Sequence, residues 1–195
     1  MRGTSHSGVR RGNGYARDMR YVALLRGINV GGKNKVAMAD LRTIMTDLGH
    51  AEVKTHLQSG NAVFTAPETD PETLESALSA AIETALGTSL RIMVRTEAEI
   101  ASVVENAPFT PADGARFQVC FLGAPPEKGL FDDVADAYPP ERLAVAGREI
   151  YLDLPDGIRD AKLPVLVDRK LKKDLTARNW NTVLKVLEIC RLSSG

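Results

Sequence analysis

The sequence has little of several features that would assign the protein to a functional class. Its 195 residues include only two cysteines, Cys120 and Cys190, which lie far apart in apolar runs. Such a pair is typical of buried thiols in a reduced compartment and not of a disulfide framework. No apolar run reaches the roughly 18 residues that cross a membrane. We therefore expect a cytoplasmic protein with no membrane partner.

Net charge and metal-ligand spacing are also missing. The 25 basic and 25 acidic residues cancel, so total charge gives no argument for a nucleic-acid partner. The three histidines, His6, His50 and His56, lack the spacing of a metal site. The sequence thus predicts no metal centre and names no cofactor. It also gives no basis for an oligomeric state.

The first 18 residues are rich in glycine, serine and arginine. They contain no apolar stretch of the kind that a secretory signal requires. We interpret residues 1–18 as a disordered tail or a non-native extension, with the fold beginning at Met19.

The next part of the chain predicts six elements in the order strand, helix, strand, strand, helix, strand. Apolar residues recur at three- and four-residue steps over 38–48 and again over 74–85, which predicts two helices. Asp70-Pro71 marks the start of the second helix. Strands are expected at 19–26, 52–57, 61–65 and 90–95. This order is that of the split β-α-β, or ferredoxin-like, arrangement.

The remaining sequence nearly repeats the pattern. We expect a helix at 97–106, a strand at 116–122, a helix at 130–138, a hairpin of 142–146 and 149–154, and helical segments near 164–173 and 180–192. The sequence therefore predicts an α+β fold of two similar ferredoxin-like halves, with antiparallel sheets and a C-terminal helical segment. The first half is placed at 19–96 and the second at 112–195.

The most informative motif is the loop after the first strand, Arg26-Gly27-Ile28-Asn29-Val30-Gly31-Gly32-Lys33-Asn34-Lys35. Gly27 and Gly32-Lys33 match most of the phosphate-binding pattern G-x-x-x-x-G-K-[ST]. Asn34 stands where that pattern needs a hydroxyl for Mg²⁺, and the strands are largely antiparallel, which disfavours a nucleotide hydrolase. Two readings stay open: a looser anion site, or a connection in which Asn29 and Asn34 bond their own backbone.

Two further motifs contain polar side chains that are suited to a pocket. Gln58-Ser59-Gly60-Asn61 is predicted to be a turn between two strands. Residues 176–182, which read Thr-Ala-Arg-Asn-Trp-Asn-Thr, are predicted to open the last helix, with Thr176, Asn179 or Asn181 as its cap. Arg178 conflicts there with the helix dipole unless it serves an acid or an anionic ligand.

Together these segments resemble the bacterial family known as domain of unknown function 1697. The resemblance rests on residues 24–32 with Asn34, Lys35 and Met38, on residues 58–61 with Phe64, on Lys162-Leu163, and on residues 176–182. It spans about 19–190. It implies a compact α+β protein of two similar ferredoxin-like halves, and it implies no established reaction.

Our leading functional hypothesis is a protein that binds an anionic ligand, namely a nucleotide, a phosphate ester or a short nucleic acid. Arginine suits bidentate contacts with oxyanions. No catalytic residue is assigned. The candidate ligand-binding residues are Arg26, Asn29, Asn34, Lys35, Gln58, Ser59, Asn61, Lys162, Arg178 and Asn179.

Three alternatives remain at this stage. One is an enzyme that acts on a small phosphorylated or carboxylated substrate, with Lys35 or His56 in proton transfer. Another is an RNA-binding module, in which strand aromatics stack on bases. A third is a structural or interaction role with no ligand. The aromatics available for stacking are Phe64, Phe117, Phe121 and Tyr151.

Overall fold

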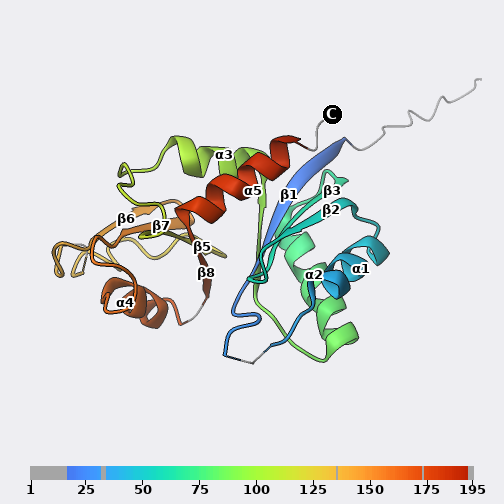
Figure 1. Ribbon diagram of the computed structural model, residues 1–195, viewed down its shortest axis with the longest axis horizontal. Helices are drawn as coiled ribbons and strands as arrows, with labels where there is room; N and C mark the ends of the chain where they lie inside the picture. The colour runs from blue at the N-terminus through green and yellow to red at the C-terminus, as the bar shows by residue number, and fades with distance from the viewer. Residues whose placement is uncertain (1–16, 32–33, 135, 173, 193–195) are drawn as a thin grey trace, which may run out of the picture.

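The computed structural model describes residues 17–31, 34–134, 136–172 and 174–192. Residues 1–16 of the expected tail lie outside these ranges, and so do Gly32 and Lys33 of the glycine-rich loop. The boundaries given above for the tail and the two halves stay predictions. Two four-stranded antiparallel sheets and five helices make up the described chain (Figure 1), which confirms the expected α+β class.

The first sheet has the ferredoxin-like strand order β2-β3-β1-β4. Asp70 accepts a hydrogen bond from Thr73 N and caps α2, with Pro71 in its first turn, as the sequence predicts. Both helices cover one face of the sheet (Figure 1). The elements are β1 (Asp18–Leu25), α1 (Met38–Asp47), β2 (Ala51–His56), β3 (Asn61–Pro67), α2 (Pro71–Leu86) and β4 (Ile92–Thr96).

The second sheet repeats this order as β6-β7-β5-β8. Its elements are β5 (Phe117–Leu122), β6 (Arg142–Ala146), β7 (Glu149–Asp153), α4 (Leu163–Lys170) and β8 (Leu175–Asn179). The helix expected at 130–138 is wrong, because the described residues of that segment form turns. Phe131 and Val134 are nevertheless buried against the sheet, so turns supply the cover that a helix supplies in the first half.

A second correction concerns β8, which the sequence analysis assigned to the start of the last helix. Arg178 lies in this strand and pairs with Val119 of β5. Helix α5 (Trp180–Leu192) begins only after it. Asn179 accepts a hydrogen bond from Thr182 N at 2.9 Å, so the capping role proposed for Asn179 is correct. The dipole argument for Arg178 fails, because Arg178 precedes the helix.

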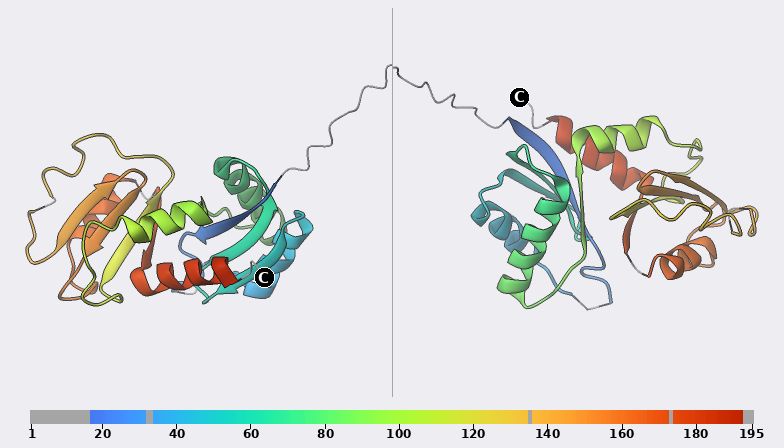
Figure 2. Two further views of the ribbon diagram at one scale, coloured as in Figure 1. Left: turned by 90° about the horizontal axis from the view of Figure 1, so that it is seen from above. Right: turned by 180° about the vertical axis from the view of Figure 1, so that it is seen from behind.

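The two halves share a central core. The inner faces of both sheets pack against α3 (Glu97–Glu105) and α5, which run across the junction (Figures 1 and 2). Val22 and Met93 come from the first sheet, and Phe117 and Val119 from the second. The outer faces have separate cores, under α1 and α2 in one half and under α4 in the other. The shared layer therefore fixes the halves relative to each other.

None of the helices in the described ranges is long and apolar enough to cross a membrane.

Candidate functional site

Arg178 is the centre of a hydrogen-bond network that joins the two halves. Its side chain lies on β8 and the residue is 8% exposed. It donates to Leu25 O at 2.8 Å, at the end of β1, and to Gly60 O at 3.0 Å. Its other acceptors are Ser59 O, Asn61 Oδ1, Thr176 Oγ1 and Ala177 O. All six acceptors are uncharged oxygens, so the guanidinium is buried without a bonded carboxylate.

The turn between β2 and β3 is ordered around Asn61. This residue is fully buried, and its Nδ2 donates to His56 O at 2.9 Å and to Ser59 Oγ at 3.1 Å. Its Oδ1 accepts from Arg178. Asn61 thus closes the turn and joins it to β8. Its side-chain amide is already hydrogen-bonded within the protein and has little capacity left to bind a ligand.

The glycine-rich loop is held to the same turn by Asn29. Its Nδ2 donates to Gln58 O at 2.8 Å and to Val36 O at 2.9 Å, and its Oδ1 accepts from Val36 N at 3.0 Å. Asn34 Nδ2 donates to Gly27 O at 3.3 Å, and Asn34 O accepts from Asn29 N. Both asparagines bond backbone, which agrees with the reading of this segment as a self-bonded connection.

Arg26 crosses from the first half to the second. Its Nη2 pairs with Asp168 Oδ1 of α4 at 2.6 Å, and its Nη1 donates to Leu175 O of β8. Leu122 N donates to Arg148 O on the β7 side, so by alternation the peptide groups of Leu175 and Ala177 face away from β5. Arg26 and Arg178 therefore donate hydrogen bonds to the carbonyls that point outward from the edge strand β8.

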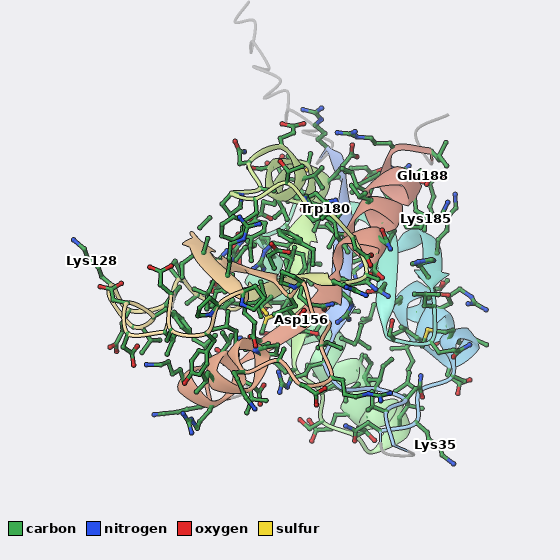
Figure 3. All side chains as sticks on the ribbon, turned by 60° about the vertical axis from the view of Figure 1, so that its left-hand side comes forward. Lys35, Lys128, Asp156, Trp180, Lys185 and Glu188 are labelled. Atoms are coloured by element: carbon green, nitrogen blue, oxygen red, sulfur yellow. The ribbon has the colours of Figure 1, made fainter. Side chains whose placement is uncertain are left out.

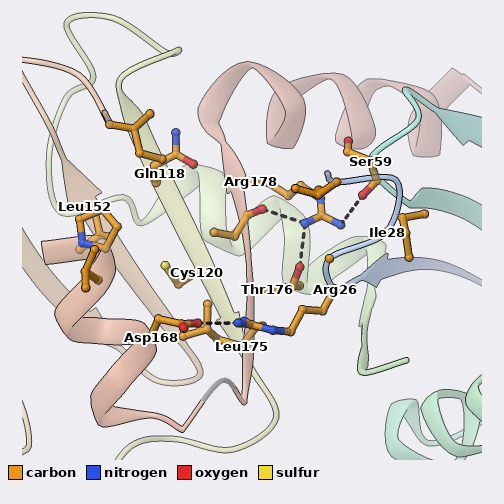
Figure 4. Close-up of a pocket in the computed structure, with 16 residues that line it drawn as sticks. Arg26, Ile28, Ser59, Gln118, Cys120, Leu152, Asp168, Leu175, Thr176 and Arg178 are labelled. Carbon is orange, nitrogen blue, oxygen red and sulfur yellow. Dashed lines mark hydrogen bonds and ion pairs between the residues drawn. The ribbon is translucent and has the colours of Figure 1, made fainter. Parts of the chain in front are cut away.

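A cleft of about 550 Å³ opens beside this network, between the glycine-rich loop and the second sheet (Figure 4). The motifs singled out in the sequence contribute Arg26, Gly27, Ile28, Val30, Ser59, Thr176, Ala177 and Arg178 to its wall. Aliphatic side chains and Cys120 make up most of the rest. The other lining residues are Gln118, Cys120, Leu152, Ile158, Pro164, Val165, Asp168 and Leu175.

The charges in the cleft do not balance. Its lining includes two arginines and one aspartate, so one positive charge is left over. Burial lowers the pKa of Arg178 to about 10, which still leaves it protonated at neutral pH. The pKa of the Cys120 thiol is raised to about 12, mainly by burial and also by the negative charge of the nearby Asp168. That thiol stays neutral, and it is unsuited to act as a nucleophile.

Several candidate residues from the sequence lie outside the cleft wall. Lys35 is exposed and points away from the molecule (Figure 3). Asn34 and Gln58 are exposed, and Asn179 caps α5. Lys162 immediately precedes α4 and lines an adjoining hollow of about 360 Å³. Glu141 accepts hydrogen bonds from Lys162 N and Leu163 N.

Half of the sixteen residues that line the cleft lie outside the sequence motifs. Asp168 and Gln118 are polar residues in otherwise ordinary helix and strand patterns, so no local signal marks them. Ile158 and Val165 are exposed aliphatic residues, as is Val30 in the glycine-rich loop. The residue type alone does not show that a hydrophobic side chain is exposed. These residues come together only because the glycine-rich loop lies against the second sheet in the folded chain.

The residues that the enzyme and RNA-binding alternatives depend on lie outside the cleft. His56 ends β2, and burial, followed by Lys185, lowers its pKa. Phe64, Phe117, Phe121 and Tyr151 are all buried in the cores, so their faces are not offered to bases. Within the ranges described, no three His, Cys, Asp or Glu side chains gather as a metal site.

The comparison with known proteins agrees with this architecture. Residues 19–151 match the model of a family described as protein of unknown function (DUF1697). The chain belongs to this family. The segments at 162–163 and 176–182, which carry Lys162 and Arg178, lie beyond the matched residues.

A solved structure extends the likeness over most of the chain. It is the conserved bacterial protein SP0830 from Streptococcus pneumoniae, with a TM-score of 0.69 and 25% sequence identity. The match covers 89% of this chain and 99% of that one. No curated protein matches the sequence. The family and the fold are therefore established, and neither of them indicates a reaction.

Proposed function

We propose that the cleft between the two halves binds a small organic anion, whose carboxylate or phosphate group contacts Arg26. The observation that carries this proposal is the unbalanced charge of the lining, two arginines against one aspartate. A buried cation without a carboxylate partner favours an anion nearby, because Coulomb energies are larger where water is excluded.

Arg26 is the residue best suited to contact the anion. An arginine has five N–H groups, and two nitrogens of Arg26 are engaged by Asp168 and Leu175 O. Its Nε has no acceptor among the described residues. Arg178, in contrast, donates its N–H groups to protein oxygens, so it contributes positive charge to the cleft but does not contact the ligand directly.

The charge of the cleft favours a ligand with one anionic group. A polyphosphate needs several cations or a metal ion, and Lys35 and Lys162 do not line the cleft. Among the classes suggested by the sequence, a phosphate monoester fits better than a nucleoside triphosphate or a nucleic acid. The enzyme alternative gains no support, since the cleft lining includes no histidine and its cysteine is neutral.

The proposal is tested by thermal shift of the full chain with benzoate, phenyl phosphate and adenosine monophosphate. A ligand at 100 times its Kd adds about 2.7 kcal/mol of stability, which raises the Tm by about 5–10 °C at this chain length. The Ala177→Phe variant should abolish the shift, because Ala177 is exposed and lines the cleft. Phenylalanine there fills the ligand's space and removes no side-chain contact.

Ala39→Phe is the matched control, since Ala39 is exposed on α1 and does not line the cleft. It should keep the ligand-induced shift of the wild type. An equal shift in the wild type and in Ala177→Phe would show that the anion binds elsewhere. If neither phosphates nor carboxylates stabilise the protein, the proposal is wrong.

A further inference from the structure

The mouth of the cleft exposes an unusual amount of aliphatic surface. Five large hydrophobic side chains in the described part of the chain are more than half exposed. Three of them line this cleft: Val30 at 67%, Ile158 at 55% and Val165 at 67%. We call these three residues the aliphatic rim. They come from the glycine-rich loop, from the segment before α4 and from α4 itself, so the fold gathers them from separate segments.

The floor of the cleft continues this apolar surface. Cys120 and Leu152 are buried there on adjoining strands, in the core beneath α4. The charged groups lie on the side where Arg26 and Arg178 contact β8, and the amide of Gln118 lies apart from them (Figure 4). The cleft is therefore amphipathic, with a cationic side and an aliphatic side.

A peptide strand is a poor occupant of this cleft. Extended peptides bind by adding backbone hydrogen bonds to a free sheet edge. The outward carbonyls of β8, Leu175 O and Ala177 O, already accept from Arg26 and Arg178. The edge of β8 is thus blocked along the cleft, and a small molecule without a peptide backbone fits the remaining surface better.

We infer that the ligand is an amphipathic monocarboxylate, whose single negative charge matches the one positive charge left over in the lining and whose apolar body covers the aliphatic rim. This inference rests on the proposed function, and it adds the chemical class of the ligand. The carboxylate contacts Arg26, and the hydrocarbon body packs against Val30, Ile158 and Val165. Binding is favoured because the hydrocarbon body removes these exposed side chains from water.

The test is a calorimetric titration of the full chain with butanoate, hexanoate, octanoate and decanoate. Each added methylene that packs on the rim should tighten Kd about fourfold, the equivalent of about 0.8 kcal/mol. The dicarboxylate of octanoate's length should bind more weakly than octanoate, because its second charge would lie against aliphatic side chains.

Val165→Ser gives the residue-level test. It should weaken octanoate several-fold and weaken butanoate much less. Val145→Ser is the matched control, because Val145 is 43% exposed on β6 and lines no part of the cleft. Affinity that does not depend on chain length, or a dicarboxylate that binds more tightly, would overturn the inference and leave the proposed function intact. If no monocarboxylate binds while phenyl phosphate does, the inference is overturned and the proposed function stands; failure of both classes to bind would overturn both.

Discussion

At the scale of single residues, Arg178 shows why a cationic motif is not by itself a ligand site. Its guanidinium donates to Leu25 O, Ser59 O and Gly60 O in the first half, and to Thr176 Oγ1 and Ala177 O on its own strand. A planar group with five donors matches this set, and an ammonium with three does not. The residue thus holds the cleft's wall in shape.

Arg178→Lys should therefore lower the free energy of unfolding by about 3 kcal/mol, because buried carbonyls lose their donors. Urea denaturation followed by circular dichroism measures the loss. Arg116→Lys is the control: the Arg116 side chain is 54% exposed, and the change should stay within about 0.5 kcal/mol. An Arg178→Lys protein that keeps wild-type stability and loses only anion binding would assign Arg178 a direct ligand contact instead.

At the scale of elements, the turn between β2 and β3 depends on one glycine. Gly60 has φ +77°, and a Cβ there would lie 2.8 Å from both Leu25 Cβ and Ile28 Cδ1. Leu25 N also donates to Gly60 O at 2.9 Å. The turn, the end of β1 and the glycine-rich loop are therefore packed too closely to admit a side chain.

A matched pair of glycine substitutions separates this crowding from backbone strain. Gly147 turns the β6–β7 hairpin with φ +61° and open space around its Cβ position, so Gly147→Ala should cost only about 1 kcal/mol. Gly60→Ala should cost about 1–3 kcal/mol more, through overpacking. Thermal denaturation of both variants gives the difference. Equal losses would mean that the turn accommodates a methyl group.

The elements also show how far the sequence predicts this fold. The helices α1, α2, α3 and α5 and the β6–β7 hairpin lie where the sequence predicts them, α1 and α2 from their apolar periodicity. Strand β8 was missed because its polar residues were interpreted as the cap of the helix that follows, although Leu175, Thr176, Ala177 and Arg178 alternate between apolar and polar. Leu175 packs under α4, while Thr176 and Arg178 face the first half, so the polar side of this strand is buried and not exposed to solvent.

The segment at 130–138 failed for a different reason. Phe131 and Val134 are buried, so the apolar spacing that predicted a helix is real. Turns satisfy the same spacing, and Gly129 at φ +81° lies in the first of them, which Leu130 N closes by donating to Glu127 O. For the cleft, the sequence indicated the motifs at Arg26, Ser59 and Arg178. It carried no signal for the aliphatic rim, whose exposure is a property of the assembled halves.

At the scale of the whole molecule, the two halves are one structural unit. The inner faces of both sheets share a core with α3 and α5. Arg26–Asp168 at 2.6 Å and Arg91–Asp174 at 2.6 Å pair across the junction. The cleft lies at this junction, so its geometry is fixed by the shared core and does not require closure of one half on the other.

Met93→Ala tests this unity. Met93 is fully buried on the inner face of the first sheet, in the shared core. Its truncation should cost about 2–5 kcal/mol, and unfolding should remain a single transition that protects neither sheet. Hydrogen exchange of amides in β1 and β5 should accelerate together. Acceleration confined to the first sheet would contradict a shared core.

The most direct test of the central claim is a chemical-shift map of the nitrogen-15-labelled full chain titrated with octanoate and with phenyl phosphate. We predict perturbed amides at Gly27, Ile28, Asp168 and Ala177, on both sides of the cleft. The groove between α1 and α2, lined by Ile44, Leu48 and Ala81, should be unaffected. Perturbations confined to that groove, or none at saturating ligand, would contradict an anion site between the halves.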